Sequence, residues 1–254
     1  MVYKLPEPTL SKTLPTEHDL PDTDNQPVDN ELQLFIPGLL RAILLIAWAD
    51  RLDWFLGANI GLYYDPNRPA VGPDAFLSLG APRLRPGKDL RLSYVLWEER
   101  VMPTWTLEVV SQKPGGEYDR KMKLYAELGI LYYTIYNPKH YKRDKHDSFE
   151  VYRLIEGEYV RQQGNPVWMP EVGLGIGVDS GVHYGLPERD WLYWYDENGN
   201  PYPTQKELVA QVTLQARQAE AQAREAEEAA KEERRLREAL MQKLRDRGID
   251  PTTL

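Results

Sequence analysis

Short apolar runs separated by turn residues fill the middle of the chain, a pattern typical of strands in a sheet. The segment 117–128 instead repeats its apolar residues at helical spacing and ends at Gly129, a residue that often closes a helix. Because this helix lies between the expected strands 104–110 and 130–136, it predicts a strand–helix–strand unit with a parallel strand pair. The expected strands are 58–64, 73–79, 104–110, 130–136, 149–155, 159–163, 167–169, 174–178 and 191–195.

Helical patterns also flank this strand-rich region on both sides. Apolar residues recur every three or four positions from Leu32 to Ala47, and Pro37 predicts that this helix begins near that proline and ends around Asp53. Residues 205–247 are almost all strong helix formers, and Gly248 follows them as a stop. The apolar seam of this second helix is mostly alanine, so a solvated single helix and a weak coiled coil both remain open.

These patterns divide the chain into three regions. Residues 1–30 are rich in proline and aspartate and are expected to be disordered or loosely packed. Residues 31–203 are expected to form an α/β core, with a central mixed sheet flanked by helices and antiparallel additions. Residues 204–254 form a charged helical tail.

The composition of the chain excludes several kinds of protein. The chain of 254 residues is 42% hydrophobic and has no cysteine, which excludes disulfides and cysteine-rich zinc sites. The apolar stretch 39–48 is interrupted by Arg41 and is too short to span a membrane, and residues 1–27 do not resemble a signal peptide. A cytoplasmic protein without a membrane partner is expected. The net charge of −8 argues against promiscuous binding to DNA.

Other surface patterns suggest partners. The aromatic residues at 191 and 193–195 predict a homodimer, because such residues are enriched at protein interfaces. The tail offers Leu236, Leu240 and Leu244 to a helical partner. Two basic clusters, at 83–91 and 139–145, are interpreted as solvated loops.

Three charged residues stand where a plain core would have none. Glu108 lies inside an expected buried strand, where a carboxylate is costly unless it is paired or binds a cation. Lys121 lies in the middle of the apolar stripe of the helix 117–128, and Asp74 follows Pro73 at the start of a strand. Taken singly, each has a plain structural explanation: a strand end in water, a lysine reaching to solvent, or a turn.

Taken together, the three residues predict a catalytic site. Two carboxylates from neighbouring strands can bind a hard divalent cation, Mg²⁺ or Mn²⁺, which needs only one or two such ligands beside water and phosphate oxygens. A lysine beside them can orient a water nucleophile or offset charge that grows on phosphorus. Asp74, Glu108 and Lys121 are therefore the candidate catalytic residues.

The chain also resembles a known family over about residues 31–194. It is similar to the Uma-two family, whose members are restriction-endonuclease-like nucleases with a PD-(D/E)xK core, and to cyanobacterial members that carry a helical tail. Two departures are visible: an acidic stretch that is often found near the N-terminus in the family is missing, and Gln112 replaces the usual proline. The resemblance is carried by Pro73-Asp74, Leu107-Glu108-Val109-Val110-Ser111, the run 118–130, Tyr132-Tyr133 and Asn137-Pro138.

The resemblance implies roles for individual residues. Asp74 would be the motif aspartate and Glu108 the motif glutamate, and both would bind the metal with help from the backbone carbonyl of Val109. The lysine position of the ordinary motif falls on Val110, and the family moves that lysine to the following helix, where Lys121 matches. The implied activity is Mg²⁺-dependent hydrolysis of nucleic acid, with DNA as the expected substrate. The alternative is a non-catalytic binding or scaffolding protein on the same fold, with the tail as its partner-binding element.

Overall fold

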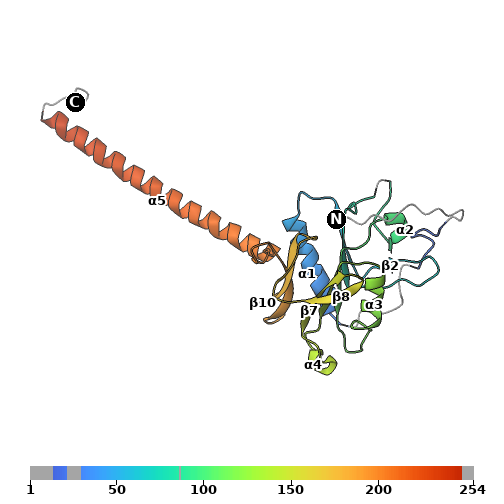
Figure 1. Ribbon diagram of the computed structural model, residues 1–254. Coiled ribbons are helices and arrows are strands. Elements are labelled where there is room, and N and C mark those ends of the chain that lie inside the picture. Colours follow the sequence, from blue (N-terminus) through green and yellow to red (C-terminus); the bar gives the residue numbers. More distant parts are fainter. Residues whose placement is uncertain (1–13, 22–29, 86, 248–254) are drawn as a thin grey trace. The chain divides into compact units, whose positions relative to one another are not determined.

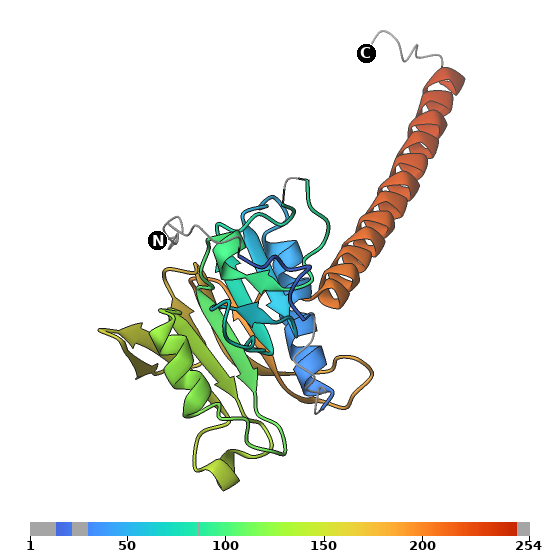
Figure 2. The same ribbon diagram turned by 90° about the vertical axis from the view of Figure 1, so that its right-hand side faces the viewer.

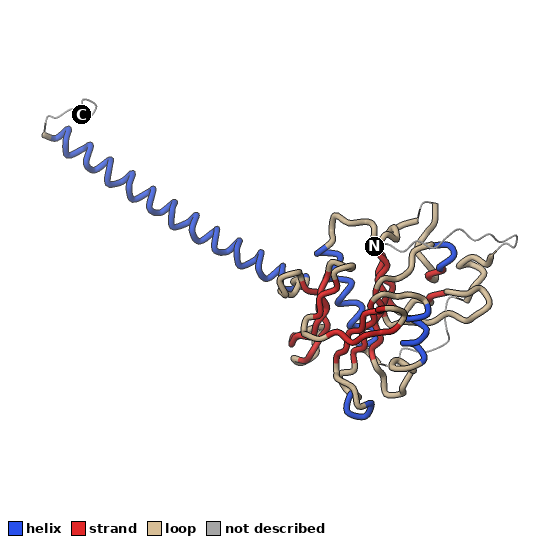
Figure 3. The backbone as a smooth tube through the Cα atoms, viewed as in Figure 1, coloured by secondary structure: helices blue, strands red, loops and turns tan. Residues whose placement is uncertain are grey.

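The computed structural model describes residues 14–21, 30–85 and 87–247, and the chain divides into two units between Tyr202 and Pro203. The first unit contains eleven strands and four of the helices (Figures 1 and 3). The strands are β1 Trp54–Ala58, β2 Leu62–Tyr63, β3 Ala75–Leu79, β4 Tyr94–Val95, β5 Trp105–Val109, β6 Tyr132–Tyr136, β7 Phe149–Ile155, β8 Glu158–Gln162, β9 Val167–Met169, β10 Leu174–Gly181 and β11 Arg189–Tyr195. The helices are α1 Leu32–Ala47, α2 Leu96–Glu99, α3 Arg120–Glu127, α4 Tyr141–Asp144 and, in the second unit, α5 Gln205–Asp246.

The central sheet has six strands in the order β1-β3-β5-β6-β7-β8. Its strands pair antiparallel except β5 and β6, which pair in parallel and are connected through α3. The strand–helix–strand unit is therefore confirmed. A second, antiparallel sheet has the order β11-β10-β9, and β2 pairs with β4 in parallel. The predicted α/β class, with a mixed central sheet and antiparallel additions, is confirmed.

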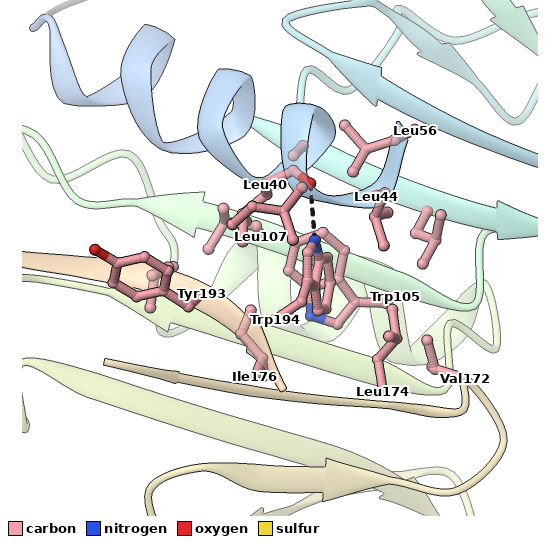
Figure 4. Packing of buried hydrophobic residues seen from close by; sticks show 14 of the residues in the cluster. Leu40, Leu44, Leu56, Trp105, Leu107, Val172, Leu174, Ile176, Tyr193 and Trp194 are labelled. Atoms are coloured by element: carbon pink, nitrogen blue, oxygen red, sulfur yellow. Dashed lines mark hydrogen bonds between the residues drawn. The ribbon is translucent and has the colours of Figure 1, made fainter. Parts of the chain in front are cut away.

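Helices α1 and α3 lie on opposite faces of the central sheet (Figure 2). Each face carries a separate hydrophobic cluster, one beneath α1 and one beneath α3. Side chains alternate between the faces along each strand. In β5, Trp105 and Leu107 point to the α1 side, where Trp194 of β11 packs against Trp105 and donates its indole N–H to the carbonyl of Leu40 at 3.0 Å (Figure 4). Position 108 consequently faces α3.

Helix α1 begins and ends earlier than predicted. It runs from Leu32 to Ala47, with Pro37 inside it. A proline has no N–H for the carbonyl four residues before it, and here that carbonyl, of Gln33, accepts the side-chain amide of Asn59 at 3.1 Å. This replacement donor lets the helix pass through the proline. At the other end, the backbone turns at Trp48, so the prediction of an end near Asp53 was wrong.

The predicted strand 58–64 was also wrong, because the chain forms two strands there. β1 starts at Trp54, and Asn59 interrupts the extended backbone with a φ of 50° before β2 begins at Leu62. Asparagine tolerates this left-handed conformation better than most residues. The aromatic pair at the start of β1, Trp54 and Phe55, lay between the predicted helix and the predicted strand and was assigned to neither.

Residues 14–21, which the sequence places in a loosely packed segment, are held against the first unit. Glu17 is 2% exposed, pairs with Arg85 at 2.6 Å and accepts the backbone N–H of Leu92. The indole of Trp97 donates to the carbonyl of Pro15 at 2.8 Å. The rest of the predicted loose segment, residues 1–13 and 22–29, lies outside the described residues.

The first basic cluster is not a solvated loop throughout. Arg85 forms ion pairs with Glu17, Glu98 and Glu99, while Arg91 pairs with Glu99 at 2.8 Å and stacks over the ring of Phe55. Both arginines are largely buried, with side-chain exposures of 10% and 3%. They neutralise acidic side chains of this chain and do not form an exposed basic patch.

The aromatic residues behind the homodimer prediction lie inside the molecule. Trp191, Tyr193, Trp194 and Tyr195 are each at most 5% exposed and belong to the cluster beneath α1. They line the core and present no aromatic surface to a second copy. The homodimer itself stays a prediction, without this support.

The second unit consists mainly of α5, which spans 42 residues. It begins with a capping box: the hydroxyl of Thr204 accepts the N–H of Glu207, and the carboxylate of Glu207 accepts the N–H of Thr204. No side chain of α5 is buried. Across the described part of the chain, no helix has the length and apolar character needed to cross a membrane.

Candidate active site

Asp74 and Glu108 face each other across two neighbouring strands. β3 and β5 pair antiparallel with Ala75 opposite Leu107, and continuing this register by one residue places Asp74 opposite Glu108. Alternation along each strand turns both side chains toward α3, away from the apolar face beneath α1. The sheet therefore brings together the two carboxylates that the sequence singled out.

Asp74 is 7% exposed, and its Oδ2 accepts the backbone N–H of Val109 at 2.7 Å. Burial raises the pKa of this carboxyl well above its ordinary value, and the nearby charge of Glu108 adds to the rise. The hydrogen bond from Val109 and the charge of Lys121 act in the opposite direction. Ionised Asp74 is thus in a position that favours a further positive charge nearby.

Glu108 is 2% exposed and receives donors from one face of α3. Lys121 contributes its ammonium at 2.7 Å from Oε2, and Tyr125, four residues later, donates its hydroxyl to Oε1 at 2.7 Å. Residues at this spacing lie on the same side of a helix. Burial raises the pKa of Glu108, while Lys121 and Tyr125 oppose that rise.

The loop before α3 sets the position of Lys121. Gly116 has a φ of 84°, and its carbonyl accepts the N–H of Lys121 at 2.8 Å, while Asp119 caps the helix through Arg120. The Lys121 side chain is 19% exposed. Burial lowers its pKa, but the Glu108 carboxylate outweighs this effect and raises the pKa above the ordinary value. Lys121 is therefore a cation at neutral pH.

Three further residues belong to the site and were not predicted. Tyr125 was assigned to the apolar stripe of α3. Gln33 of α1 donates to the carbonyl of Val109 at 3.3 Å, and Glu117 lies buried beside the other carboxylates, accepting the N–H of Gly115 at 2.8 Å. The position of Tyr125 four residues after Lys121 was a usable signal for that residue. The sequence gives no comparable signal for Gln33, whose contact spans 76 positions.

The site opens into a cleft of about 1170 Å³. Asp74, Glu108 and Glu117 line its acidic part, and Tyr63 and Tyr64 contribute aromatic surface. Further basic side chains also line the cleft, beside Lys121. An acidic floor within a basic lining matches a bound cation beneath a phosphate backbone. These basic residues are Arg68, Lys113, Arg120 and Lys123.

The donor set fits a hard divalent cation. Two carboxylates and the carbonyl of Val109 offer oxygen ligands, and each carboxylate can accept more bonds than its protein contacts use. Among the described residues, no three His, Cys, Asp or Glu side chains form a group that could hold a metal ion. A cation here would therefore complete its shell with water or phosphate oxygens, as Mg²⁺ commonly does.

The fold and the site together define an α/β protein with two carboxylates that face each other in a cleft. Residues 26–181 match the model of the family described as "Uma2: Putative restriction endonuclease". The chain belongs to this family, which confirms the resemblance seen in the sequence.

A search of solved structures and a search of curated proteins gave different results. The chain is similar to a crystal structure from Anabaena variabilis, described as "a putative nuclease belonging to DUF820", with 14% identity and a TM-score of 0.42. The match covers 57% of this chain and 76% of that one. No curated protein matches the chain.

Proposed function

We propose that this protein is a divalent-cation-dependent nuclease that hydrolyses phosphodiester bonds of nucleic acid, with DNA as the first substrate to test. The observation that carries the proposal is the meeting of Asp74, Glu108 and Lys121 at the floor of a cleft with a basic lining. Membership of the family described as "Putative restriction endonuclease" supports it. The place of action we propose is the cytoplasm, as the sequence predicts.

Each residue would have a separate task. Asp74 and Glu108, with the carbonyl of Val109, would hold Mg²⁺ or Mn²⁺. When bound, the cation would supply positive charge to the phosphate oxygens and lower the pKa of a coordinated water. Lys121 would orient the attacking water or offset the negative charge that develops on phosphorus.

The reaction itself is a simple hydrolysis. A water oxygen forms a bond to phosphorus, and the phosphorus–oxygen bond to one sugar breaks. The attacking water gives up a proton to solvent, and the leaving sugar oxygen takes up a proton from solvent to become a hydroxyl. Tyr125 keeps its hydrogen bond to Glu108 and so holds that carboxylate in place. The basic residues along the cleft would contact phosphates without reading sequence, so binding should weaken as salt is raised.

A cleavage screen tests this function. Purified protein is incubated with supercoiled, linear and single-stranded DNA and with RNA, in Mg²⁺ or Mn²⁺, and in EDTA as the control. We expect cleavage of at least one substrate with a divalent cation and none with EDTA. If every substrate stays intact under all conditions, or if EDTA leaves cleavage unchanged, the proposal fails.

Calorimetry separates this function from the alternative of a non-catalytic scaffold. Titration of Mn²⁺ into the parent protein should release or absorb heat with a defined stoichiometry, and Asp74→Ala should abolish that signal. Glu158→Gln, an exposed carboxylate on β8, is the matched control and should bind as the parent does. A parent protein that takes up no divalent cation would favour the scaffold.

A further inference from the structure

The tail helix α5 carries two charge blocks of opposite sign, placed end to end. Residues 220–233 contain six glutamates and two cations, whereas residues 234–247 contain six cations and two acidic residues. The sign changes between Glu233 and Arg234. Each block spans about four helical turns, or roughly 21 Å along the axis. Within one straight helix, ion pairs between the blocks form only near the boundary, as Arg235 does with Glu232 at 3.5 Å. The rest of their complementarity is available only to a second helix.

The same helix presents an apolar stripe that nothing in its own unit covers. Val212, Ala219, Ala226 and Leu240 share one seven-residue column, which Glu233 interrupts, and Leu236 lies on the neighbouring column. Leu236 and Leu240 are 61% and 59% exposed, and no side chain of α5 is buried. A seven-residue apolar repeat is the pattern of a helix that packs against another helix.

We infer that α5 pairs in antiparallel orientation with α5 of a second copy of this chain, aligned about the point between Arg234 and Arg235. Antiparallel alignment sets the acidic block of each copy beside the basic block of the other. A parallel pair would instead set like charges against each other, which destabilises. No other partner is needed, because the complement of each block is present in the same sequence.

A definite register follows from the apolar stripe. The alignment that brings Leu240 level with Ala229 also brings Arg237 level with Glu232 and Glu238 level with Lys231 of the other copy. A large side chain opposite a small one allows the helices to approach closely. The register also sets like charges level with each other, Arg234 with Arg235 at its centre and Arg224 with Arg245 further out. The excess of opposite charge between the facing blocks offsets this cost. The pairing would join two copies through their tails, independently of any contact between cores.

Sedimentation equilibrium of the full chain tests the charge blocks. The parent should show a concentration-dependent doubling of mass at low salt, and this doubling should disappear in the triple variant Arg234→Glu, Arg235→Glu, Arg237→Glu. Adding Glu227→Lys, Glu228→Lys and Glu232→Lys to that variant exchanges the signs of the two blocks and should restore the doubling. Circular dichroism checks that the tail stays helical. A parent whose mass is unaffected by the triple variant, or a six-fold variant that fails to recover, overturns the proposal.

Disulfide trapping tests the orientation, because the chain contains no cysteine of its own. Ala229→Cys and Leu240→Cys are made in separate full-length proteins. An equimolar mixture of the two should cross-link under mild oxidation several times more than either protein alone. Equal or stronger cross-linking of each protein with itself would indicate a parallel pair, and no cross-linking in the mixture would indicate no pair; either result overturns the inference.

Discussion

Two carboxylates face each other across β3 and β5 at a point where burial already penalises their charges. Like charges directly opposite in a sheet destabilise the fold. Hydrogen bonds offset this cost. Lys121 and Tyr125 donate to Glu108, and the backbone N–H of Val109 donates to Asp74. Such a costly arrangement is typical of a functional site, where stability is given up for activity.

Burial of the Asp74 charge should make the free energy of unfolding depend on pH, and replacing Asp74 should show this. The raised pKa means that the folded chain keeps a proton on Asp74 at pH values where the unfolded chain, with a pKa of about 3.9, has lost it. Stability therefore falls as the pH rises above about 4. Asp74→Asn is neutral throughout and retains an oxygen for Val109. In EDTA, it should be more stable than the parent at pH 8, by the roughly 0.5–2 kcal/mol that is common for a single stabilising substitution.

The measurement is urea unfolding of both proteins between pH 4 and pH 8. The advantage of Asp74→Asn should shrink toward pH 4, where the unfolded parent also begins to hold a proton on Asp74. An advantage that grows toward acid pH would show that the Asp74 carboxylate stabilises the fold, contrary to the direction of its pKa shift.

The hydroxyl of Tyr125 should matter more than that of another buried tyrosine. Tyr125→Phe leaves one oxygen of the Glu108 carboxylate without its donor, at a cost of about 1–3 kcal/mol. Tyr159→Phe is the matched control, because the Tyr159 hydroxyl donates to a neutral backbone carbonyl, that of Ile130. Urea unfolding should show the larger loss for Tyr125→Phe. Equal losses would mean that the carboxylate does not depend on this bond.

Asp74, Glu108 and Lys121 could be predicted from the sequence because each is a charged residue at a position where a plain core would have none. Glu108 stood in a buried strand and Lys121 on an apolar helix face, and a strand–helix–strand unit brings such positions together. Tyr125 violated no rule, since a tyrosine on an apolar face is ordinary core. Its spacing of four residues from Lys121 places it on the same helix face, but the packing of α3 on β5 decides that its hydroxyl reaches Glu108.

At the scale of elements, long-range partners decided where the predictions failed. Pro37 suggested the start of a helix, but Asn59 supplies the donor that lets α1 continue through it. The loop 83–91 was predicted to be a solvated basic segment. Its residues Arg85 and Arg91 are instead largely buried, in ion pairs with Glu17 and with the acidic residues of α2, Glu98 and Glu99. The local sequence does not indicate Asn59, Glu17 or the acidic residues of α2 as partners, because each is separated from the residue that it contacts by more than a turn or a strand.

The Glu17 contact should hold the segment 14–21 in place. Glu17→Gln weakens the ion pair to Arg85 and the bond to the Leu92 N–H, so amide hydrogen exchange should accelerate at residues 14–21 and at Leu92. Asp89→Asn, an exposed change in the same loop, is the control and should leave exchange unchanged. Unaltered exchange in Glu17→Gln would mean that the other contacts of residues 14–21 are enough to hold this segment in place.

At the scale of the whole molecule, the tail and the site belong to different units. The site is built entirely within residues before Tyr202, and no α5 side chain is buried. A chain ending at Pro203 should therefore melt within a few degrees of the full chain and bind Mn²⁺ with the same affinity, as calorimetry can show. A large loss of melting temperature or of affinity would place part of the tail on the core.

The central claim concerns Glu108, and a cleavage rate tests it most directly. On the substrate that the parent cuts best in Mn²⁺, Glu108→Gln and Glu158→Gln are compared at equal concentration, after circular dichroism has shown that both are folded. Removal of a charge that acts in the transition state typically lowers a rate by about 10² to 10³. We predict such a loss for Glu108→Gln and parental activity for Glu158→Gln. Cleavage by Glu108→Gln at the parental rate would contradict the account.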